Sequence, residues 1–257
     1  MPTAKNLLTS IRKIRHYPDF LVHKIIYDIF KKKMGNRIVS GPFLGMKYRE
    51  AQIKEPHFPS LLGTHELELQ PLIEQLCKKP FTDIINAGAD EGYYAIGLAI
   101  RNPRARIIAF EANPERRTLI KRMAQINNVI DRVNIYGLCD VRSLSDSLSK
   151  CNKCLIVMDI EGGECILLDS FIVPKLKECH ILVELHVCFF SEIGEIIYER
   201  FKDSHRITEI LQKSRRVEDF RIKLSGMAQF IPKKFLIVNM WENRDPADKW
   251  FYLEPNI

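Results

Sequence analysis

The chain lacks several features that mark particular classes of protein. No apolar run approaches the about 18 uninterrupted residues needed to span a bilayer, because the apolar segments are only as long as strands. No internal repeat or low-complexity segment is present, which excludes the solenoid classes. The 257 residues are 46% hydrophobic and 28% charged, which excludes collagen-like, disordered and disulfide-scaffold chains. We therefore expect a globular α/β domain with a short extension, and we do not expect the protein to be integral to a membrane.

A paired set of cysteines is also missing. The seven cysteines are an odd number and are scattered through apolar patterns, which suits a reducing compartment better than a disulfide framework. The first residues lack a continuous apolar segment that ends in small residues, so no secretory signal is indicated. We therefore expect a cytoplasmic protein.

Acidic residues are scarce at the start of the chain, where basic residues gather. Residues 1–40 contain nine of the 39 Lys and Arg but only two of the 32 Asp and Glu, which leaves 30 of each sign in the remainder. The first 40 residues therefore carry the whole net charge of +7. Their apolar residues recur on one face of two helices, one on each side of Pro18, which predicts a basic amphipathic helical arm.

This arm has four interpretations. We favour a helical cover or a self-association element, because most amphipathic helices bury their apolar face against protein. Peripheral attachment to an anionic membrane, here the inner membrane surface, comes next, because basic residues cluster beside an apolar helical face. RNA contact and a cleaved organellar presequence are weaker alternatives. After the arm at 1–40, we expect a connector at 41–63 and the main domain at 64–257.

Short apolar runs alternate with helical patterns over the rest of the chain, as in wound α/β folds. Four runs are nearly continuously apolar, which is typical of parallel strands with helices on both faces. The first five strands should therefore be central and parallel. We predict strands at Thr82–Asn86, Arg106–Glu111, Arg132–Tyr136, Leu155–Asp159, His180–His186, His205–Leu211 and Lys234–Trp241, with a further short strand at Phe43–Tyr48. Helices are expected at Thr64–Leu76, Gly92–Ile100, Pro114–Asn127, Cys165–Phe171 and Ser191–Phe201.

The segment from Ile84 to Glu111 carries the clearest chemical signal. An apolar strand ends at the polar Asn86, the chain turns through Gly88, and a helix opens near Gly92. Glycines at such a turn let the backbone approach a ligand, and ligands of open α/β sheets lie over the carboxyl ends of the strands. Glu111 ends the next strand 19 residues beyond Gly92, where a carboxylate would meet ribose hydroxyls. These features predict a ligand that contains a nucleoside.

The charge of the turn distinguishes between such ligands. A dinucleotide would need glycines spaced G-x-G-x-x-G and an uncharged helix start for its pyrophosphate. Here Asp90 and Glu91 stand between Gly88 and Gly92, and two carboxylates repel phosphate. A P-loop is excluded because no G-K-[ST] follows. S-adenosylmethionine (SAM) has no phosphate and carries a sulfonium and an ammonium, so the acidic turn favours SAM. A purely structural turn would leave Glu111 unexplained.

Four segments, in order and at fitting spacings, resemble the signatures of the FkbM-like family of class I SAM-dependent methyltransferases. They run from Asn86 to Tyr94, Phe110 to Pro114, Met158 to Glu164 and Val183 to His186, and the resemblance covers residues 60–243. It implies a Rossmann-like α/β fold whose seven-stranded, mostly parallel sheet has the order 3-2-1-4-5-7-6, with the last strand antiparallel and helices on both faces. The family usually has Asp where Asn86 stands and Asn where Asp90 stands, so the carboxylate of this turn is displaced.

The resemblance also implies roles for individual residues. The turn would line the methionine end of SAM, and Glu111 would bind the ribose hydroxyls. Ala112, Asn113 and Asp140 would lie near the adenine, and Glu66 is a further candidate partner for the SAM ammonium. The predicted cofactor-binding residues are Glu66, Asn86, Gly88, Ala89, Asp90, Gly92, Tyr93, Glu111, Ala112, Asn113, Asp140 and Asp159.

Ionisable groups gather where the fourth and fifth predicted strands end. His186 is our preferred general base because imidazole titrates near neutrality. Asp159 and Glu184 would orient it, position the acceptor, or hold a divalent cation through oxygen ligands, which is the less favoured option. A packed structural histidine is the alternative for His186, and a helix start is the alternative for Glu161 and Glu164. The predicted catalytic residues are His186, Asp159, Glu184 and Glu161, with no metal site assigned.

Two other groups of residues have weaker interpretations. Cys151 and Cys154 have zinc-like spacing, and Cys179 with His180 could complete four ligands. A single C-x-x-C is weak evidence, and free cysteine is common in apolar strands, so we expect no zinc. The aromatic residues near the C-terminus should cover a sheet edge or, alternatively, line an acceptor pocket; they are Trp241, Trp250, Phe251 and Tyr252.

Together these features predict a SAM-dependent methyltransferase that methylates a hydroxyl by direct displacement with the help of a general base. The resemblance implies a sugar, a glycan or another small polar acceptor, lipid-linked if the arm binds membrane. Two alternatives stay open. An RNA methyltransferase would use the basic arm, but the residues after the fourth strand read Asp159-Ile-Glu161-Gly162 rather than N-P-P-Y, which makes nucleic acid the less favoured partner. A non-catalytic SAM-binding protein would need none of the carboxylates at the strand ends.

Overall fold

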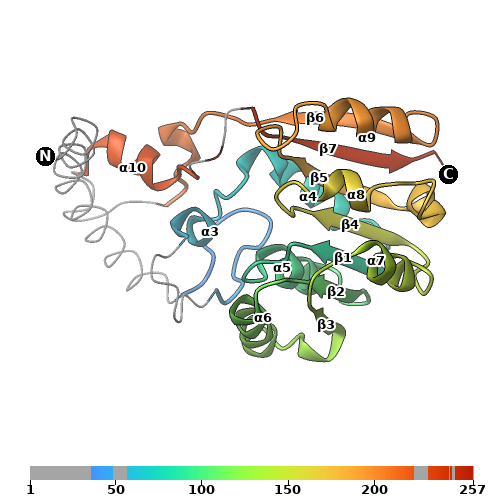
Figure 1. Ribbon diagram of the computed structural model, residues 1–257. Helices are drawn as coiled ribbons and strands as arrows, with labels where there is room; N and C mark the ends of the chain where they lie inside the picture. The colour runs from blue at the N-terminus through green and yellow to red at the C-terminus, as the bar shows by residue number, and fades with distance from the viewer. Residues whose placement is uncertain (1–35, 49–56, 223–230, 243, 245–246, 257) are drawn as a thin grey trace, which may run out of the picture.

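The computed structural model describes residues 36–48, 57–222, 231–242, 244 and 247–256. Seven strands form one sheet: β1 (Asp83–Ala87), β2 (Arg106–Phe110), β3 (Val133–Tyr136), β4 (Cys154–Met158), β5 (His180–Leu185), β6 (His205–Leu211) and β7 (Lys249–Pro255). Their order is β3-β2-β1-β4-β5-β7-β6 (Figure 1). The first five strands are parallel, and β7 is antiparallel to both β5 and β6. The predicted fold of class I methyltransferases is confirmed.

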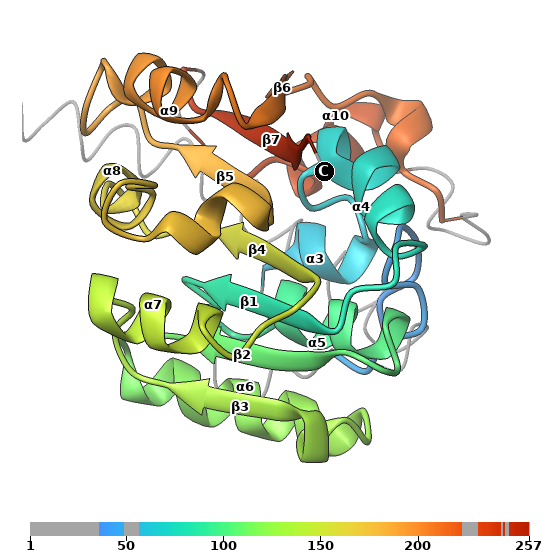
Figure 2. The same cartoon turned by 90° about the vertical axis from the view of Figure 1, so that its right-hand side faces the viewer.

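Helices lie on both faces of this sheet (Figure 2). One core cluster joins the sheet to α3, α4, α5, α6 and α10, and a second joins its other face to α7, α8 and α9. The α-helices are α3 (Phe58–Leu62), α4 (Gln70–Leu76), α5 (Tyr93–Arg101), α6 (Pro114–Ile126), α7 (Val141–Leu148), α8 (Glu164–Leu167), α9 (Ile193–Phe201) and α10 (Lys233–Asn239). Short 3-10 helices are η1 (Leu67–Leu69), η2 (Ile130–Arg132), η3 (Pro174–Glu178) and η4 (Val217–Asp219).

The central strands are apolar on both faces because both faces are covered. Successive side chains of a strand point to opposite sides of the sheet. Ile84 of β1 therefore joins the cluster that contains α5 and α6, whereas Ile85 joins the cluster that contains α7 and α8. Both side chains are fully buried. This two-sided burial explains why nearly continuous apolar runs, rather than alternating ones, marked these strands in the sequence.

The predicted seventh strand, Lys234–Trp241, is wrong, because this segment forms α10 and the seventh strand is β7. The run buries its apolar residues at helical spacing: Leu236 and Met240 lie in the core, while Val238 is half exposed. In β7, by contrast, Trp250–Leu253 are all buried, because β7 lies between β5 and β6. The aromatic residues of β7 therefore lie within the sheet and do not cover its edge.

Smaller differences concern short elements. The segment Phe43–Tyr48, predicted as a strand, is a loop with a single β-bridge between Arg37 and Lys47. Its aromatic residues at both ends are nevertheless buried in the core. The helix predicted at Cys165–Phe171 is the shorter α8. The sequence did not predict α7, whose Ser-rich segment begins with a capping box made by Asp140 and the third residue of the helix.

The predicted arm lies almost entirely within residues 1–35, outside the described residues. The division into arm, connector and domain therefore stays a prediction. Within the described part of the chain, no helix has the length and apolar character that crossing a membrane requires.

The turn after β1 is pressed against the end of β4. Gly88 has a positive φ of 76°, and a Cβ atom at this position would lie 1.6 Å from the carbonyl oxygen of Asp159. The amide of Asp159 donates a hydrogen bond to the carbonyl of Ala87, which holds the two segments together. Only glycine accommodates both this backbone conformation and this contact. The turn and the end of β4 are therefore fixed relative to each other.

We expect Gly88→Ala to lower the free energy of unfolding by about 3–4 kcal/mol, because the added methyl group would collide with backbone and not with a movable side chain. Gly45→Ala is the matched control: its φ of 85° is also positive, but a Cβ there meets nothing within 4 Å. The control should cost only the about 1–2 kcal/mol of the left-handed conformation. Urea denaturation followed by circular dichroism measures both values, and equal losses would contradict the contact.

Candidate functional site

The carboxyl ends of β1, β2 and β4 enclose the larger of two neighbouring cavities, with a volume of about 900 Å³. Such an edge is where open α/β sheets bind ligands. Acidic and apolar side chains share its lining, a combination suited to a nucleoside. The cavity is lined by Gly88, Asp90, Phe110, Glu111, Ala112, Arg116, Leu138, Cys139, Asp140, Val141, Arg142, Asp159, Ile160, Glu161, Gly163, Ile166 and Leu167.

A smaller cavity of about 390 Å³ lies on the other side of the turn after β1. It shares four residues with the larger cavity, namely Gly88, Asp90, Arg116 and Asp159, so the two adjoin along the turn. Its remaining lining comes from the segment before α4, from β1 and the turn after it, from the start of α5 and from β4: His57, Ser60, His65, Asn86, Ala89, Glu91, Tyr93, Tyr94 and Val157. A ligand that reaches from one cavity into the other would pass directly over the turn.

The predicted ribose carboxylate, Glu111, stands beside this turn. One of its oxygens accepts a hydrogen bond from the amide of Asp90 and the other from the amide of Asn113, both at 2.8 Å. Asn113 in turn caps α6 and does not line the larger cavity, whereas Ala112 does. Asp140 also lines that cavity, next to the start of α7. The backbone amides therefore hold the Glu111 carboxylate at the cavity wall.

Arg116 of α6 reduces the negative charge of the turn. Its guanidinium lies 3.0 Å from the carboxylate of Asp90 and 2.8 Å from that of Glu91. Two carboxylates of the turn therefore share one guanidinium, and the Glu111 carboxylate beside them is held by backbone amides, so the turn keeps an excess of negative charge. Arg116 was not predicted from the sequence, although a basic residue in the first turn of the helix that follows Glu111 could have indicated it.

The smaller cavity contains a buried polar atom without a hydrogen-bond partner. Asn86 is 1% exposed, and its amide nitrogen donates to the carbonyl of Val157. In the described structure its Oδ1 atom has no partner. Buried polar atoms normally have one, so this oxygen is suited to a donor group on a ligand. The predicted residues Ala89 and Tyr93 line the same cavity, while Gly92 begins α5 with a positive φ.

Glu66 lies behind this cavity in a buried position. Tyr94 donates its hydroxyl hydrogen to one carboxylate oxygen of Glu66, and Arg244 lies 3.4 Å from the other. Burial raises the pKa of Glu66 to about 8, against the opposing effect of Arg244. A carboxylate with such a pKa is readily stabilised by an additional positive charge.

Asp159, Glu184 and His186 form a cluster beside the two cavities. His186 Nε2 lies 3.5 Å from Asp159 Oδ1 and 4.0 Å from Glu184 Oε2. The opposite ring nitrogen, Nδ1, lies 2.9 Å from Glu164 Oε1. Three of the four predicted catalytic residues therefore come together, whereas Glu161 is exposed, lines the larger cavity and lies outside this cluster.

The carboxylates of the cluster change its protonation. Burial by itself lowers the pKa of His186, but the hydrogen bond to Glu164 and the charges of Glu184 and Asp159 raise it to about 9. Loss of hydration around the carboxylate, although 40% of the side chain stays exposed, and the charges of Glu184 and Glu66 raise the pKa of Asp159 well above its usual range. Protons are therefore held by this cluster at neutral pH, as expected where carboxylates outnumber cations.

Glu164 was predicted as a possible helix start, and it also supports His186. Its side chain is fully buried at the beginning of α8, and its carboxylate accepts hydrogen bonds from the amide of Gly162. The same carboxylate contacts His186 Nδ1, which places the hydrogen of the neutral ring on Nδ1 and leaves Nε2 facing Asp159 and Glu184.

A network of buried ion pairs covers the cluster from the C-terminal part of the chain. Arg244 pairs with Glu184, and its guanidinium also lies 5.7 Å from the centre of the Trp250 ring. Arg215 pairs with Glu68 at 2.9 Å and with Glu242 at 2.7 Å. The sequence analysis did not find these residues, because nothing in their local pattern indicates that a segment so far along the chain packs against the ends of β4 and β5.

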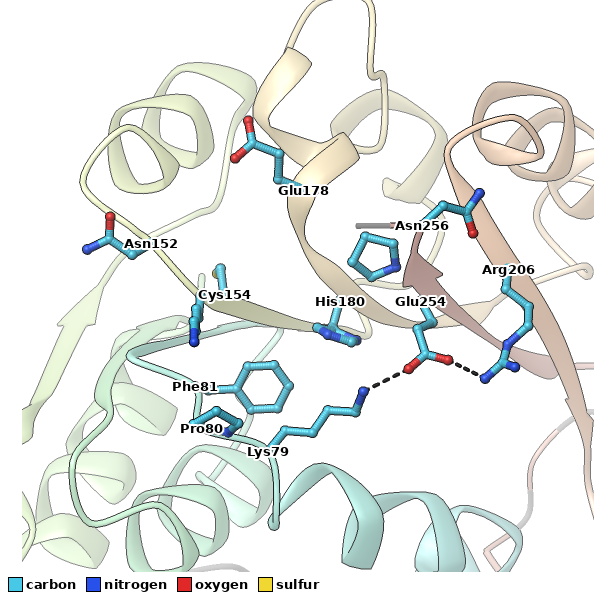
Figure 3. A pocket seen from close by; sticks show the side chains of 12 residues that line it. Lys79, Pro80, Phe81, Asn152, Cys154, Glu178, His180, Arg206, Glu254 and Asn256 are labelled. Atoms are coloured by element: carbon cyan, nitrogen blue, oxygen red, sulfur yellow. Dashed lines mark hydrogen bonds and ion pairs between the residues drawn. The ribbon is translucent and has the colours of Figure 1, made fainter.

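A different pocket, of about 580 Å³, lies at the opposite edge of the sheet, where β4 and β5 begin (Figure 3). In it, Glu254 lies between Lys79 and Arg206, and Phe81 packs edge-on against His180. The acidic group therefore already has two basic partners. This pocket lies away from the strand ends that carry the predicted site.

The set considered for zinc lies near this opposite edge. The thiol of Cys151 donates to the carbonyl of Ser147, that of Cys179 donates to the carbonyl of Lys175, and His180 pairs with the hydroxyl of Tyr252. Among the described residues, the His, Cys, Asp and Glu side chains close enough to share an ion are Asp159, Glu184 and His186. They do not include the zinc-like set.

Comparisons with known proteins give only weak likenesses. No protein-family model and no curated protein matches the chain. Among solved structures, the chain is similar to the O-methyltransferase TomG from Streptomyces achromogenes, involved in tomaymycin synthesis and in complex with SAM, at 14% identity and a TM-score of 0.45 over 63% of this chain and 85% of that one.

Two further solved structures are similar in the same way. An O-methyltransferase from Bacillus cereus in complex with SAH has 18% identity and a TM-score of 0.40 over 62% of this chain and 74% of its own. A fibrillarin pre-rRNA processing protein from Methanococcus jannaschii has 13% identity and a TM-score of 0.43 over 70% of this chain and 69% of its own. The strand order and directions, and not these likenesses, carry the fold assignment.

We expect Arg215→Met to lower the free energy of unfolding by about 3 kcal/mol, because the buried carboxylates of Glu68 and Glu242 would lose their nearest cation and keep only Arg244, at 3.6 and 3.8 Å. Arg206→Met is the matched control, since Arg206 also pairs with a glutamate but is 76% exposed. It should cost about 0–1 kcal/mol. Chemical denaturation of both variants measures the difference, and equal costs would show that the Arg215 network does not stabilise the site.

Proposed function

We propose that the chain is a SAM-dependent methyltransferase of the FkbM-like kind that methylates a hydroxyl of a sugar, a glycan or another small polar acceptor. One observation carries this proposal: two adjoining cavities follow an acidic glycine turn and meet at Asp159, next to Glu184 and His186. A binding site for a cationic nucleoside therefore adjoins a group of side chains that can hold and deprotonate an acceptor.

The residues present fit SAM. The ribose would lie against Glu111, and the adenine would lie in the larger cavity between the apolar side chains of Leu138 and Ile166 and near Asp140. The methionine part would enter the smaller cavity, where the unpartnered oxygen of Asn86 is suited to accept a hydrogen bond from its ammonium. When bound, SAM supplies a methyl group on a positively charged sulfur.

The charge of the site supports SAM over a phosphorylated nucleotide. Asp90 and Glu91 share one guanidinium, that of Arg116, while the Glu111 carboxylate is held by the backbone amides of Asp90 and Asn113, so the turn stays negative. Glu66 and Asp159 add two more carboxylates on the side of the smaller cavity, where their pKa values are raised. A sulfonium and an ammonium would stabilise the ionised forms of these groups, whereas a pyrophosphate would be repelled.

The cluster beside the cavities would act on the acceptor. Asp159 lines both cavities, so it can hold an acceptor hydroxyl close to the methyl-bearing end of the cofactor site. We keep His186 as the preferred proton acceptor, supported by its Nε2 atom, which points toward Asp159 and Glu184. Because its pKa is raised to about 9, His186 is mostly protonated at neutral pH, so it would take the acceptor's proton only after losing its own, which the positive charge of bound SAM would favour.

The identity of the acceptor rests on the family resemblance. A lipid-linked acceptor and an arm that attaches to membrane or to a second copy belong together, because both depend on residues 1–40. RNA as the substrate would require the same arm, and no described residue favours it. The cytoplasmic location inferred from the cysteine pattern likewise stays a prediction.

We expect the full chain to bind SAM, and Glu111→Gln to weaken that binding by about 10- to 100-fold, because a charged hydrogen-bond acceptor for the ribose is lost. Isothermal titration calorimetry measures the dissociation constants. Glu115→Gln, an exposed change at the start of α6, is the control and should bind SAM as the unaltered protein does. Binding that is equally tight in all three proteins would contradict the predicted ribose site.

His186→Gln should leave the SAM dissociation constant within about threefold and lower methyl transfer by about 100-fold or more, because general-base catalysis contributes about 10²–10⁴-fold. Pools of sugar and glycan acceptors incubated with methyl-labelled SAM provide the assay, and mass spectrometry identifies a product that has gained 14 daltons. His180→Gln at the opposite edge of the sheet is the matched control. Unchanged transfer in folded His186→Gln would contradict the role of the cluster.

A further inference from the structure

We propose that Asp159, Glu184 and His186 bind one divalent metal ion, through Oδ1, Oε2 and Nε2 respectively. The ligand atoms of these three residues lie within 4.8 Å of one another. The site itself needs no SAM, so it stands apart from the proposed methyl transfer. Only its chemical role, described below, rests on the proposed function.

The separations suit ligands around a single ion. Nitrogen and oxygen ligands lie about 2.0–2.2 Å from zinc, and similar distances apply to other small divalent ions, so two ligands of one ion are at most about 4.4 Å apart. The 4.8 Å within which the three ligand atoms lie is slightly above this limit. His186 Nε2 lies 3.5 Å from Asp159 Oδ1, and 4.0 Å from Glu184 Oε2. Both separations exceed the usual length of a hydrogen bond, which is about 2.7–3.2 Å. An ion between these atoms would require only small side-chain rotations.

Two of the three ligands are already oriented by partners on their far side. Glu164, fully buried and held by the amide of Gly162, contacts Nδ1 of His186 and so directs Nε2 toward the other ligands. Arg244 pairs with Oε1 of Glu184, which leaves Oε2 for the ion. Metal-binding histidines typically donate their second nitrogen to a carboxylate or carbonyl in this way, and metal-binding carboxylates are themselves hydrogen-bonded.

The third ligand gives the ion access to the cavities. Asp159 is 40% exposed and lines both of them, whereas Glu184 and His186 are buried. Three protein ligands leave open coordination positions, as in metal sites that act on substrates. One imidazole and two carboxylates suit Mn²⁺ or Zn²⁺ better than Mg²⁺ or Ca²⁺, which prefer oxygen ligands alone.

If the proposed methyl transfer is correct, this ion would bind the acceptor hydroxyl and lower its pKa. His186 would then hold the ion instead of receiving the proton, which would pass to water in the cavities as the oxygen takes the methyl group and the sulfonium becomes a neutral thioether. The acceptor would be positioned by the metal as well as by Asp159. The residues predicted for catalysis stay the same, but their task becomes coordination.

Electron paramagnetic resonance of Mn²⁺ tests the site in the full chain without SAM or acceptor. We expect one Mn²⁺ per chain, displaced by one equivalent of Zn²⁺. Asp159→Asn and His186→Gln should each weaken Mn²⁺ binding at least about 10-fold, and Glu164→Gln, which alters the support of His186, should weaken it by about 10- to 100-fold. Asp146→Asn, a change of an exposed carboxylate on α7, is the control for nonspecific binding and should change nothing.

The proposal is overturned if the folded protein binds neither Mn²⁺ nor Zn²⁺ at millimolar concentration, or if folded Asp159→Asn binds Mn²⁺ as tightly as the unaltered chain. Circular dichroism establishes folding of each variant, and the partly exposed Asp159 gives a variant with little risk to the core. SAM titration separates the two proposals. Metal binding without SAM binding refutes the proposed function and keeps the metal site, whereas SAM binding without metal binding does the reverse.

Discussion

The contact between Gly88 and the backbone of Asp159 positions the rest of the site. A side chain at Gly88 would overlap the Asp159 carbonyl, and the amide of Asp159 donates a hydrogen bond to the carbonyl of Ala87. These two contacts fix the position of the end of β1 relative to the end of β4. The turn after β1 carries the acidic residues that favour a cationic nucleoside. The end of β4 carries Asp159, the first residue of the cluster with Glu184 and His186. Because the two segments touch, the proposed cofactor site and the proposed acceptor site lie next to each other.

An excess of buried negative charge is the second constraint. Glu66, Glu184 and Asp159 lie near one another, and Arg244 provides the nearby permanent positive charge. Burying carboxylates without enough cations is costly, and the site responds by holding protons. A sulfonium, an ammonium or a metal ion would replace those protons. The proposed cofactor and the proposed metal are therefore two consequences of the same imbalance of charge.

The sequence predicted the parts of the fold that depend on local patterns. β1, β2, β4 and β5 were found because strands covered on both faces are nearly continuously apolar. The same criterion failed for residues 234–241, because a short apolar run does not distinguish a strand from a one-sided helix. The two are distinguished by burial, since Leu236 is buried whereas Val238 is half exposed, as in a one-sided helix. Burial depends on the tertiary structure, which the local sequence does not contain.

The candidate site shows the same limit. Asp159, Glu184 and His186 could be expected to meet because the carboxyl ends of adjacent parallel strands share one edge. Arg244 could not, because it comes from a segment far along the chain and reaches Glu184 only through tertiary packing. The role of Arg116 depends similarly on the rotation of α6 toward the turn. The residue types of the site could thus be read from the sequence, but the contacts between segments distant in the sequence could not.

A competition measurement tests the central claim, that the acidic turn binds a cationic adenosyl compound and not a phosphorylated nucleotide. The unaltered protein is titrated calorimetrically with S-adenosylmethionine, once alone and once in the presence of millimolar NAD or ATP. The account predicts the same dissociation constant in both titrations, and no heat of binding from NAD or ATP by themselves. Tight binding of NAD or ATP, with none of S-adenosylmethionine, would contradict it.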